Sequence, residues 1–209
     1  RQDAVLLRQL VSAGVGGESV FARLSVEQRV EVAAELLRRF EQESAPRLQR
    51  KIGEVISKLA EHVCDRGDQT AHASLGVAGW PTLLPLVYRM ADPATASSEA
   101  SCEAAMRLLW ELVPTLKEEI VSGRQGVEQI IQHGFGHSSL KIRTCALLLV
   151  CEIIQSVEKE AWKSLIVTAS VMVQVLQQLA DSTEEELFQS AVQSFIEIAT
   201  VEPDFFKVP

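Results

Sequence analysis

The chain has 209 residues, of which 47% are apolar and 23% are charged. This balance excludes a disordered or fibrous protein. Aromatic residues make up only 5%, and the dominance of Leu, Val, Ala and Glu favours helices over sheets. The net charge of −8, from 20 basic and 28 acidic residues, argues against a nucleic-acid-binding protein, because such proteins usually carry a basic excess.

The four cysteines, Cys64, Cys102, Cys145 and Cys151, lie inside apolar helical patterns. None forms a C-x-x-C pair, so we expect buried, reduced thiols in a cytosolic or nuclear protein rather than disulfides or a zinc site. No apolar run reaches the ~18–20 residues that span a bilayer. Since the chain begins without Met and inside a helical pattern, we expect it to be a fragment of a longer protein.

Amphipathic helices are predicted along the whole chain and strands nowhere. The first helix covers residues 1–13. A capping box of Ser25 and Gln28 begins the second, which runs to about residue 44. Pro46 begins the third at the first-turn position that proline favours, and residues 65–68 end it. The apolar stripes of the second and third helices are expected to face inward: Val26, Val30, Ala33, Ala34, Leu37, Phe40, Leu48, Ile52, Val55, Ile56, Leu59 and Val63.

Proline and serine residues mark the fourth and fifth helices. The fourth opens at Trp80-Pro81, and Pro85 is expected to kink it in the middle. Ser97 or Ser98 caps the fifth, which Pro114 ends.

The second half of the chain continues the pattern. Residues 115–135 are predicted to be helical, with Gly123 and Gly126 as points of interruption. Ser138 or Ser139 caps a nearly all-apolar helix over residues 140–157, on which Cys145 and Cys151 should be buried. One further helix is predicted over residues 160–180, and Ser182 or Thr183 caps the last.

A repeated pattern runs through every second of these helices. A small residue follows three positions after each of the anchors Arg1, Arg50, Cys102, Arg143 and Phe188, which lie 49, 52, 41 and 45 residues apart. This period matches HEAT and armadillo repeats, and two helices per unit favour HEAT. We therefore predict an all-α HEAT-repeat solenoid of about five two-helix repeats over residues 1–209, with the first repeat truncated. A globular helical bundle is the alternative.

Six segments follow one another along the chain in an informative order: residues 1–10, 48–52, Trp80-Pro81, 103–110, 141–144 and 187–199. No single one of them is diagnostic, whereas their order is. Together they resemble the amino-terminal repeats of importin-β-type karyopherins, the nuclear transport receptors. The resemblance covers essentially the whole chain and is greatest to the importin-four and importin-five branch.

This resemblance implies a receptor that shuttles between cytoplasm and nucleus. In such receptors, inner helices of the first repeats bind the GTP-bound form of the small GTPase Ran. Cargo binds further along the concave face, and phenylalanine-glycine repeats of nucleoporins bind clefts on the convex side. We expect no cofactor, no direct contact with nucleic acid and no membrane insertion.

Polar faces of the inner helices are the candidate Ran-binding surface. On residue type alone, they are better explained as solvated faces with ion pairs such as Glu54–Lys58 and Glu103–Arg107. Trp110 is the exception, because Trp on a polar face is a common binding anchor. With the resemblance added, the candidate Ran-binding residues are Arg8, Glu54, Lys58, Glu61, Glu103, Arg107 and Trp110.

The charge distribution indicates a second surface. Residues 1–104 hold 12 basic and 14 acidic groups, whereas residues 105–209 hold 8 and 14. The acidic excess therefore lies mainly in the second half, where a cargo rich in Lys and Arg would gain electrostatic steering.

No residue set predicts an enzyme or a metal site. His133 and His137 are four residues apart, but Gly134 and Gly136 disrupt the helix that would align them on one metal. Ser138 and Ser139 have no evident His–Asp partners. A HEAT-repeat scaffold that assembles other proteins without a transport role is the alternative function, and a small helical enzyme domain is a third class that nothing in the sequence supports.

Overall fold

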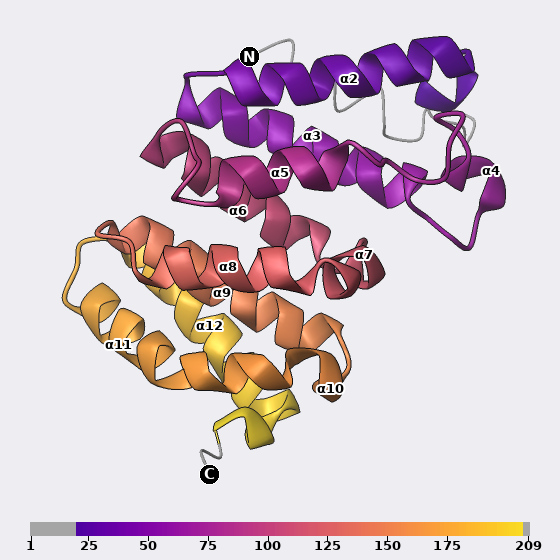
Figure 1. The fold of residues 1–209 in the computed structure, drawn as a ribbon. Coiled ribbons are helices and arrows are strands. Elements are labelled where there is room, and N and C mark those ends of the chain that lie inside the picture. Colours follow the sequence, from indigo (N-terminus) through magenta and orange to yellow (C-terminus); the bar gives the residue numbers. More distant parts are fainter. Residues whose placement is uncertain (1–19, 207–209) are drawn as a thin grey trace. The chain divides into compact units, whose positions relative to one another are not determined.

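The structure, a computed structural model, describes residues 20–206 (Figure 1). Over that range all regular elements are helices, and no strand occurs. None of these helices combines the length and hydropathy needed to cross a bilayer. The helix predicted over residues 1–13 lies outside the described residues. The chain divides into two compact units, residues 1–87 and 88–209, and each is described by itself.

The first unit is built on a hairpin of two long helices. α2 (Val26–Gln42) packs against α3 (Pro46–Val63), as Figure 1 shows. A 3-10 turn, η1 (Phe21–Arg23), precedes them, and a short helix, α4 (Gln69–His72), follows. α5 (Leu83–Ala91) crosses the boundary between the units.

The start signals of this hairpin are confirmed. Ser25 accepts from the Gln28 amide while the Gln28 side chain accepts from the Ser25 amide, which completes the capping box. Pro46 occupies the first turn of α3, where its missing N–H costs no hydrogen bond.

The predicted inward stripe of α2 is wrong at its amino-terminal end. Val26 and Val30 are 43% and 44% exposed, Ala34 is exposed, and Leu48 of α3 is also exposed. The buried residues of α2 begin at Ala33 and include Leu36. The first two turns of α2 are therefore less covered than the rest, which helical periodicity alone does not reveal.

The predicted proline kink in the fourth helix is also wrong. α5 begins at Leu83, so Pro85 is its third residue. Because first-turn amides have no acceptor within the helix, proline removes no helical hydrogen bond there. α4 was not predicted. Asp68 caps it by accepting from the amides of Thr70 and Ala71.

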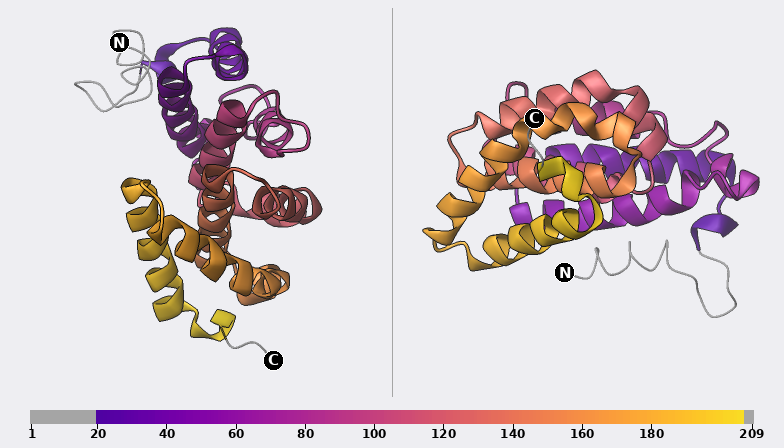
Figure 2. Two further views of the ribbon diagram at one scale, coloured as in Figure 1. Left: turned by 90° about the vertical axis from the view of Figure 1, so that its left-hand side faces the viewer. Right: turned by 90° about the horizontal axis from the view of Figure 1, so that it is seen from below.

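One central helix organises the second unit. α9 packs against α6, α8, α11 and α12, and Figure 2 shows it from two further directions. Eleven of its residues are buried, so no solvent-facing stripe interrupts its apolar sequence. The elements of the unit are α6 (Glu99–Leu112), α7 (Lys117–Ser122), α8 (Arg124–Phe135), α9 (Leu140–Ser156), α10 (Lys159–Trp162), η2 (Lys163–Thr168), α11 (Ala169–Ala180), α12 (Glu185–Val201) and η3 (Pro203–Phe206).

Burial of the cysteines on α9 is confirmed. Cys145 and Cys151 are each 1% exposed and form no disulfide, and Cys102 on α6 is 2% exposed. Burial raises the pKa of the Cys102 thiol to about 12, and it also raises the pKa of the Cys151 thiol. These thiols therefore stay protonated and behave as apolar core groups.

Two glycines make room for an aromatic ring where α7 meets α8. Gly123 separates the two helices, as expected, whereas Gly126 lies inside α8. A Cβ at Gly123 would lie 3.4 Å from the Tyr88 hydroxyl, and one at Gly126 would lie 3.6 Å from the Tyr88 ring. Burial of this ring raises the pKa of Tyr88 to about 12.

The remaining boundaries of the second unit differ in detail from the prediction. Ser98 caps α6 as expected. Ser139 precedes α9, but its hydroxyl donates to Glu99 Oε1 at 2.6 Å instead of capping the helix. The single helix expected over residues 160–180 is divided into α10, η2 and α11. Glu184, and neither Ser182 nor Thr183, is the N-cap residue of α12.

Candidate interaction sites

The candidate residues on α3 lie within two separate ion pairs. Lys51 Nζ is 2.6 Å from Glu54 Oε1, and Lys58 Nζ is 2.6 Å from Glu61 Oε1. The predicted pairing of Glu54 with Lys58 is therefore wrong, because each side chain pairs three residues away instead. All four side chains are more than 40% exposed, so each pair contributes little to stability and can exchange partners at low cost.

The candidate residues on α6 are more deeply placed. The predicted pair of Glu103 and Arg107 is confirmed, with 3.2 Å between Oε1 and Nε. Glu103 is only 9% exposed, so it belongs more to the helix packing than to a solvated face. Trp110 Nε1 donates to Glu152 Oε2 at 3.2 Å. This hydrogen bond ties α6 to α9 and satisfies the polar edge of a half-buried ring.

The seven candidate Ran-binding residues thus fall into three groups. The structure brings Lys58 together with Glu61, and Glu103 together with Arg107. The α3 set and the α6 set belong to different units, and Arg8 lies outside the described residues.

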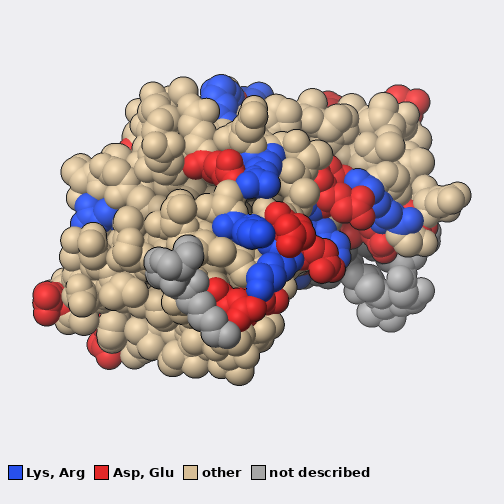
Figure 3. All heavy atoms as spheres, turned by 60° about the horizontal axis from the view of Figure 1, so that its bottom comes forward, with Lys and Arg blue, Asp and Glu red and all other residues tan. Residues whose placement is uncertain are grey.

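Acidic and basic side chains are interspersed on the face of the molecule drawn in Figure 3. Most of them adjoin a side chain of the opposite sign, and a few lie apart near the edges of the view. On α2 and α3 too, opposite charges lie next to each other in local ion pairs, such as Glu35 with Arg38 at 2.6 Å. Such alternating charges on α2 and α3 suit a partner that carries both signs of charge.

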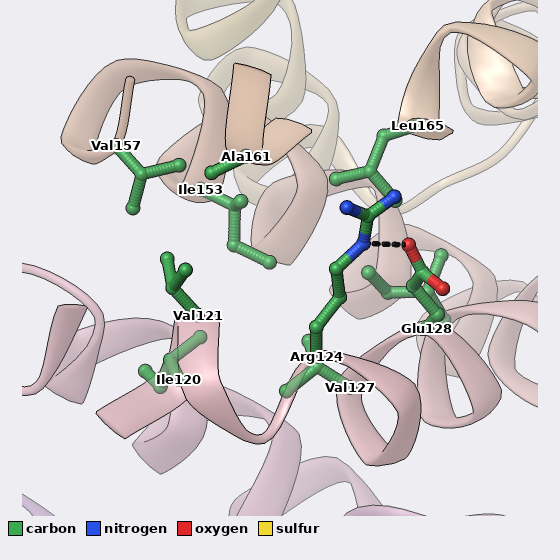
Figure 4. Close-up of a pocket in the computed structure, with 10 residues that line it drawn as sticks. Ile120, Val121, Arg124, Val127, Glu128, Ile153, Val157, Ala161 and Leu165 are labelled. Atoms are coloured by element: carbon green, nitrogen blue, oxygen red, sulfur yellow. Dashed lines mark hydrogen bonds and ion pairs between the residues drawn. The ribbon is translucent and has the colours of Figure 1, made fainter. Parts of the chain in front are cut away.

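A shallow apolar depression lies in the second unit, between the α7–α8 pair and the segment from α9 to η2. Figure 4 shows the Arg124 side chain extending from α8 toward Leu165, with Val121 on one side and Glu128 on the other. The free volume is about 20 Å³, roughly the space of one water molecule. Its apolar lining comprises Ile120, Val121, Val127, Ile131, Ile153, Val157, Ala161 and Leu165.

A polar cluster closes one side of this depression. Glu128 Oε1 accepts from Arg124 Nε at 2.6 Å and from Ser164 Oγ at 2.5 Å. These two donors lower the pKa of the Glu128 carboxyl, the Ser164 hydroxyl having the larger effect. The cluster holds the Arg124 side chain across the apolar floor.

Comparison with known families identifies the chain. The family described as "IPO5-like, TPR repeats" matches residues 44–208. The chain belongs to the IPO5-like family. It is thus an importin-β-type karyopherin, the class of nuclear transport receptors that the resemblance predicted. The comparison with curated proteins found no significant match.

Solved structures with the same fold include Kap121p alone, Kap121p bound to Pho4p and Kap121p bound to Nup53p. Kap121p alone overlays 98% of this chain on 20% of its own length, with a TM-score of 0.60 and 18% identity. The Pho4p complex gives a TM-score of 0.63 and 17% identity over the same shares. The Nup53p complex gives 0.60 and 17%, with 19% of its chain covered. The likeness confirms an all-α HEAT-repeat solenoid, and the chain spans about a fifth of these relatives.

The polar side chains of this karyopherin chain show no constellation for metal binding in residues 20–206. No group of three His, Cys, Asp or Glu side chains there could hold a metal ion. His133 Nδ1 instead lies 2.7 Å from Asp92 Oδ1, which links α8 to the turn after α5. His137 Nδ1 accepts from the Ser139 amide at 3.1 Å.

Sequence reasoning missed the apolar depression of the karyopherin chain. Its lining comes from α7, α8, α9, α10 and η2. In the sequence, these apolar residues have the spacing of the buried face of an ordinary amphipathic helix. Only the stacking of consecutive repeats places these residues together, so no spacing within one helix signals the site.

Proposed function

We propose that this chain acts within a nuclear transport receptor that shuttles between cytoplasm and nucleus and imports basic cargo proteins, with all 209 residues forming one stretch of solenoid. The family match over residues 44–208 carries the proposal. Structures of Kap121p with Nup53p, Pho4p and Ste12p show that a chain of this fold binds other proteins. The acidic excess of residues 105–209, with 8 basic and 14 acidic groups, supports basic cargo.

In this proposal, the GTP-bound form of Ran contacts the exposed ion pairs of α3 and the polar edge of α6. Glu54, Lys58 and Glu61 can each release a neighbouring side chain in favour of a partner group, because surface ion pairs are weak. Arg107 and Trp110 present a charge and a half-buried ring from α6. Arg8 and Glu103 complete the set, Arg8 on sequence grounds alone and Glu103 by holding Arg107.

The apolar depression beside Arg124 is the proposed contact for phenylalanine-glycine nucleoporins. Its free volume of about 20 Å³ is too small for a phenyl ring. Arg124 must therefore swing away from Glu128 before a ring reaches the apolar floor. The exposed Val121 at the edge of the depression extends the apolar surface on which such a ring would rest.

Charge reversal on α3 tests the GTPase contact. The double variant Glu54→Lys/Glu61→Lys should weaken binding of the chain to Ran loaded with a non-hydrolysable GTP analogue by about 2 kcal/mol or more if both are hot spots. The matched control is Glu31→Lys/Glu35→Lys on α2, which changes the net charge equally and also removes surface ion pairs. Titration calorimetry should show a loss for the first variant only. An equal loss for both would mean that net charge, and not this site, determines binding.

Trp110→Ala extends the same test to α6. The substitution removes the ring and the hydrogen bond to Glu152, so circular dichroism and the melting temperature must accompany the binding measurement. Trp110→Phe removes only the hydrogen bond and keeps most of the ring. If Trp110 is an anchor, Trp110→Phe should bind the GTPase more tightly than Trp110→Ala. Equal binding by the folded variants would exclude an anchoring role.

A further inference from the structure

A second and larger cavity lies in the second unit, where the turn between α8 and α9 meets α11. Its volume is about 390 Å³, which accommodates a short stretch of peptide. Polar side chains line most of it, chiefly Arg143, His137, Gln174 and Gln178, while Phe135 and Val171 form apolar walls. The Ran and nucleoporin contacts proposed above use other residues.

The guanidinium of Arg143 is the only formal charge in the lining. It donates from Nη1 to the carbonyl oxygens of His137 and Ser138 at 2.7 and 2.8 Å. Nη2 donates to Gln178 Oε1 at 2.8 Å. All three acceptors are neutral, and among the described residues the Nε donor is buried without a partner. Arg143 is thus a half-buried cation held by the turn with its charge uncompensated.

The neighbouring polar groups also present donors. The Ser139 amide donates to His137 Nδ1 at 3.1 Å, so the neutral imidazole carries its proton on Nε2. Because Gln178 Oε1 accepts from Arg143, its amide N–H groups are left to donate elsewhere. The lining therefore offers three kinds of donor: an arginine, an imidazole N–H and a side-chain amide. A donor-rich cavity with one uncompensated cation is complementary to an anion.

We infer that this cavity binds a carboxylate side chain of an acidic peptide segment in a protein partner, with Arg143 as the central charge. One guanidinium matches the single charge of Asp or Glu. A phosphate dianion would exceed it, and the surrounding second half of the chain is acidic, with 14 acidic groups against 8 basic. Phe135 and Val171 can cover the methylene groups of the inserted side chain.

The test uses the 209-residue chain and three synthetic pentapeptides, Ac-Gly-Gly-X-Gly-Gly-amide, in which X is Glu, Gln or phosphoserine. Binding is followed by NMR through the side-chain amides of Gln174 and Gln178 and the Arg143 Nε–H. The Glu peptide should shift these signals in a saturable manner. The Gln peptide should bind at least about tenfold more weakly, because it lacks the charge-assisted hydrogen bonds. Equal binding of the Glu and Gln peptides would overturn the assignment, and so would tighter binding of phosphoserine.

A substitution that supplies an internal carboxylate gives a second readout. Gln178→Glu replaces the amide whose Oε1 accepts from Arg143 by a carboxylate. It should raise the melting temperature and abolish binding of the Glu peptide. Arg143→Ala is less suitable, because it would also remove the hydrogen bonds to the carbonyl oxygens of His137 and Ser138. Gln177→Glu, at an exposed position of the same helix, is the matched control and should leave both properties unchanged. Retained binding in Gln178→Glu, or an equal loss in both variants, would contradict the proposal.

Discussion

Gly134 lies where α8 packs closely against α9 and α6. A Cβ at this position would lie 2.9 Å from Ala146 Cβ on α9 and 3.1 Å from Met106 Cε on α6. Met106 can move its terminal methyl group, but Ala146 is fixed to the central helix. The absence of a side chain at Gly134 therefore sets how closely α8 packs against α9.

We expect Gly134→Ala to lower the free energy of unfolding by about 1–3 kcal/mol, because overpacking outweighs the gain in helix propensity. Gly126→Ala in the same helix is the matched control. Its Cβ would lie 3.6 Å from the Tyr88 ring, which is ordinary contact, so it should be neutral or stabilise by up to ~1 kcal/mol. Urea denaturation measures both, and a stabilising Gly134→Ala would contradict the packing described here.

Arg124 lines the apolar depression that we propose as the nucleoporin contact. Arg124→Ala removes the side chain that crosses the apolar floor and frees Glu128 from its ion pair. It should therefore increase the affinity for a phenylalanine-glycine peptide, and Lys117→Ala on α7 should not, although it removes the same charge. Fluorescence anisotropy with a labelled peptide makes the comparison. Weaker binding by Arg124→Ala would show that Arg124 contacts the peptide directly.

At the scale of elements, Glu128 joins α8 to η2 through Ser164. Its pKa is lowered in the folded chain, so its contribution to stability is present above the unfolded pKa of about 4.5 and is lost as the pH falls through the folded pKa. Glu128→Gln should therefore be less stable than the parent at pH 7, and the difference should narrow below about pH 4.5. Denaturation at several pH values measures this, and a difference that stays constant with pH would contradict a stabilising role of the ionised Glu128 carboxylate with Ser164 and Arg124.

Helix starts were predictable where a local side chain determines them. Ser25, Pro46 and Ser98 each act within a single turn, so their chemistry can be read from neighbouring residues. The division of residues 160–180 was not predictable, because a 3-10 segment over Lys163–Thr168 keeps an apolar spacing close to that of an α-helix.

The candidate sites divide in the same way. The ion pair of Glu103 with Arg107 follows from helical spacing and was predicted. Glu54 pairs with Lys51 and not with Lys58 because of the side-chain rotamers. The spacing of residues along the helix allows both pairs and does not determine which one forms. The contact between Trp110 and Glu152 joins residues on different helices. It requires the packing of α6 on α9, which no short motif encodes.

For the whole molecule, the proposed role of this IPO5-like chain in nuclear transport depends on its binding to the GTP form of Ran. The most direct measurement is the affinity of the 209-residue chain for Ran loaded with a non-hydrolysable GTP analogue and for Ran loaded with GDP, at physiological salt. We expect the chain to retain the GTP form and to bind the GDP form at least about tenfold more weakly, a difference of about 1.4 kcal/mol. Equal affinity for the two forms, or binding to neither, would contradict this expectation and favour a scaffold that assembles proteins without a transport role.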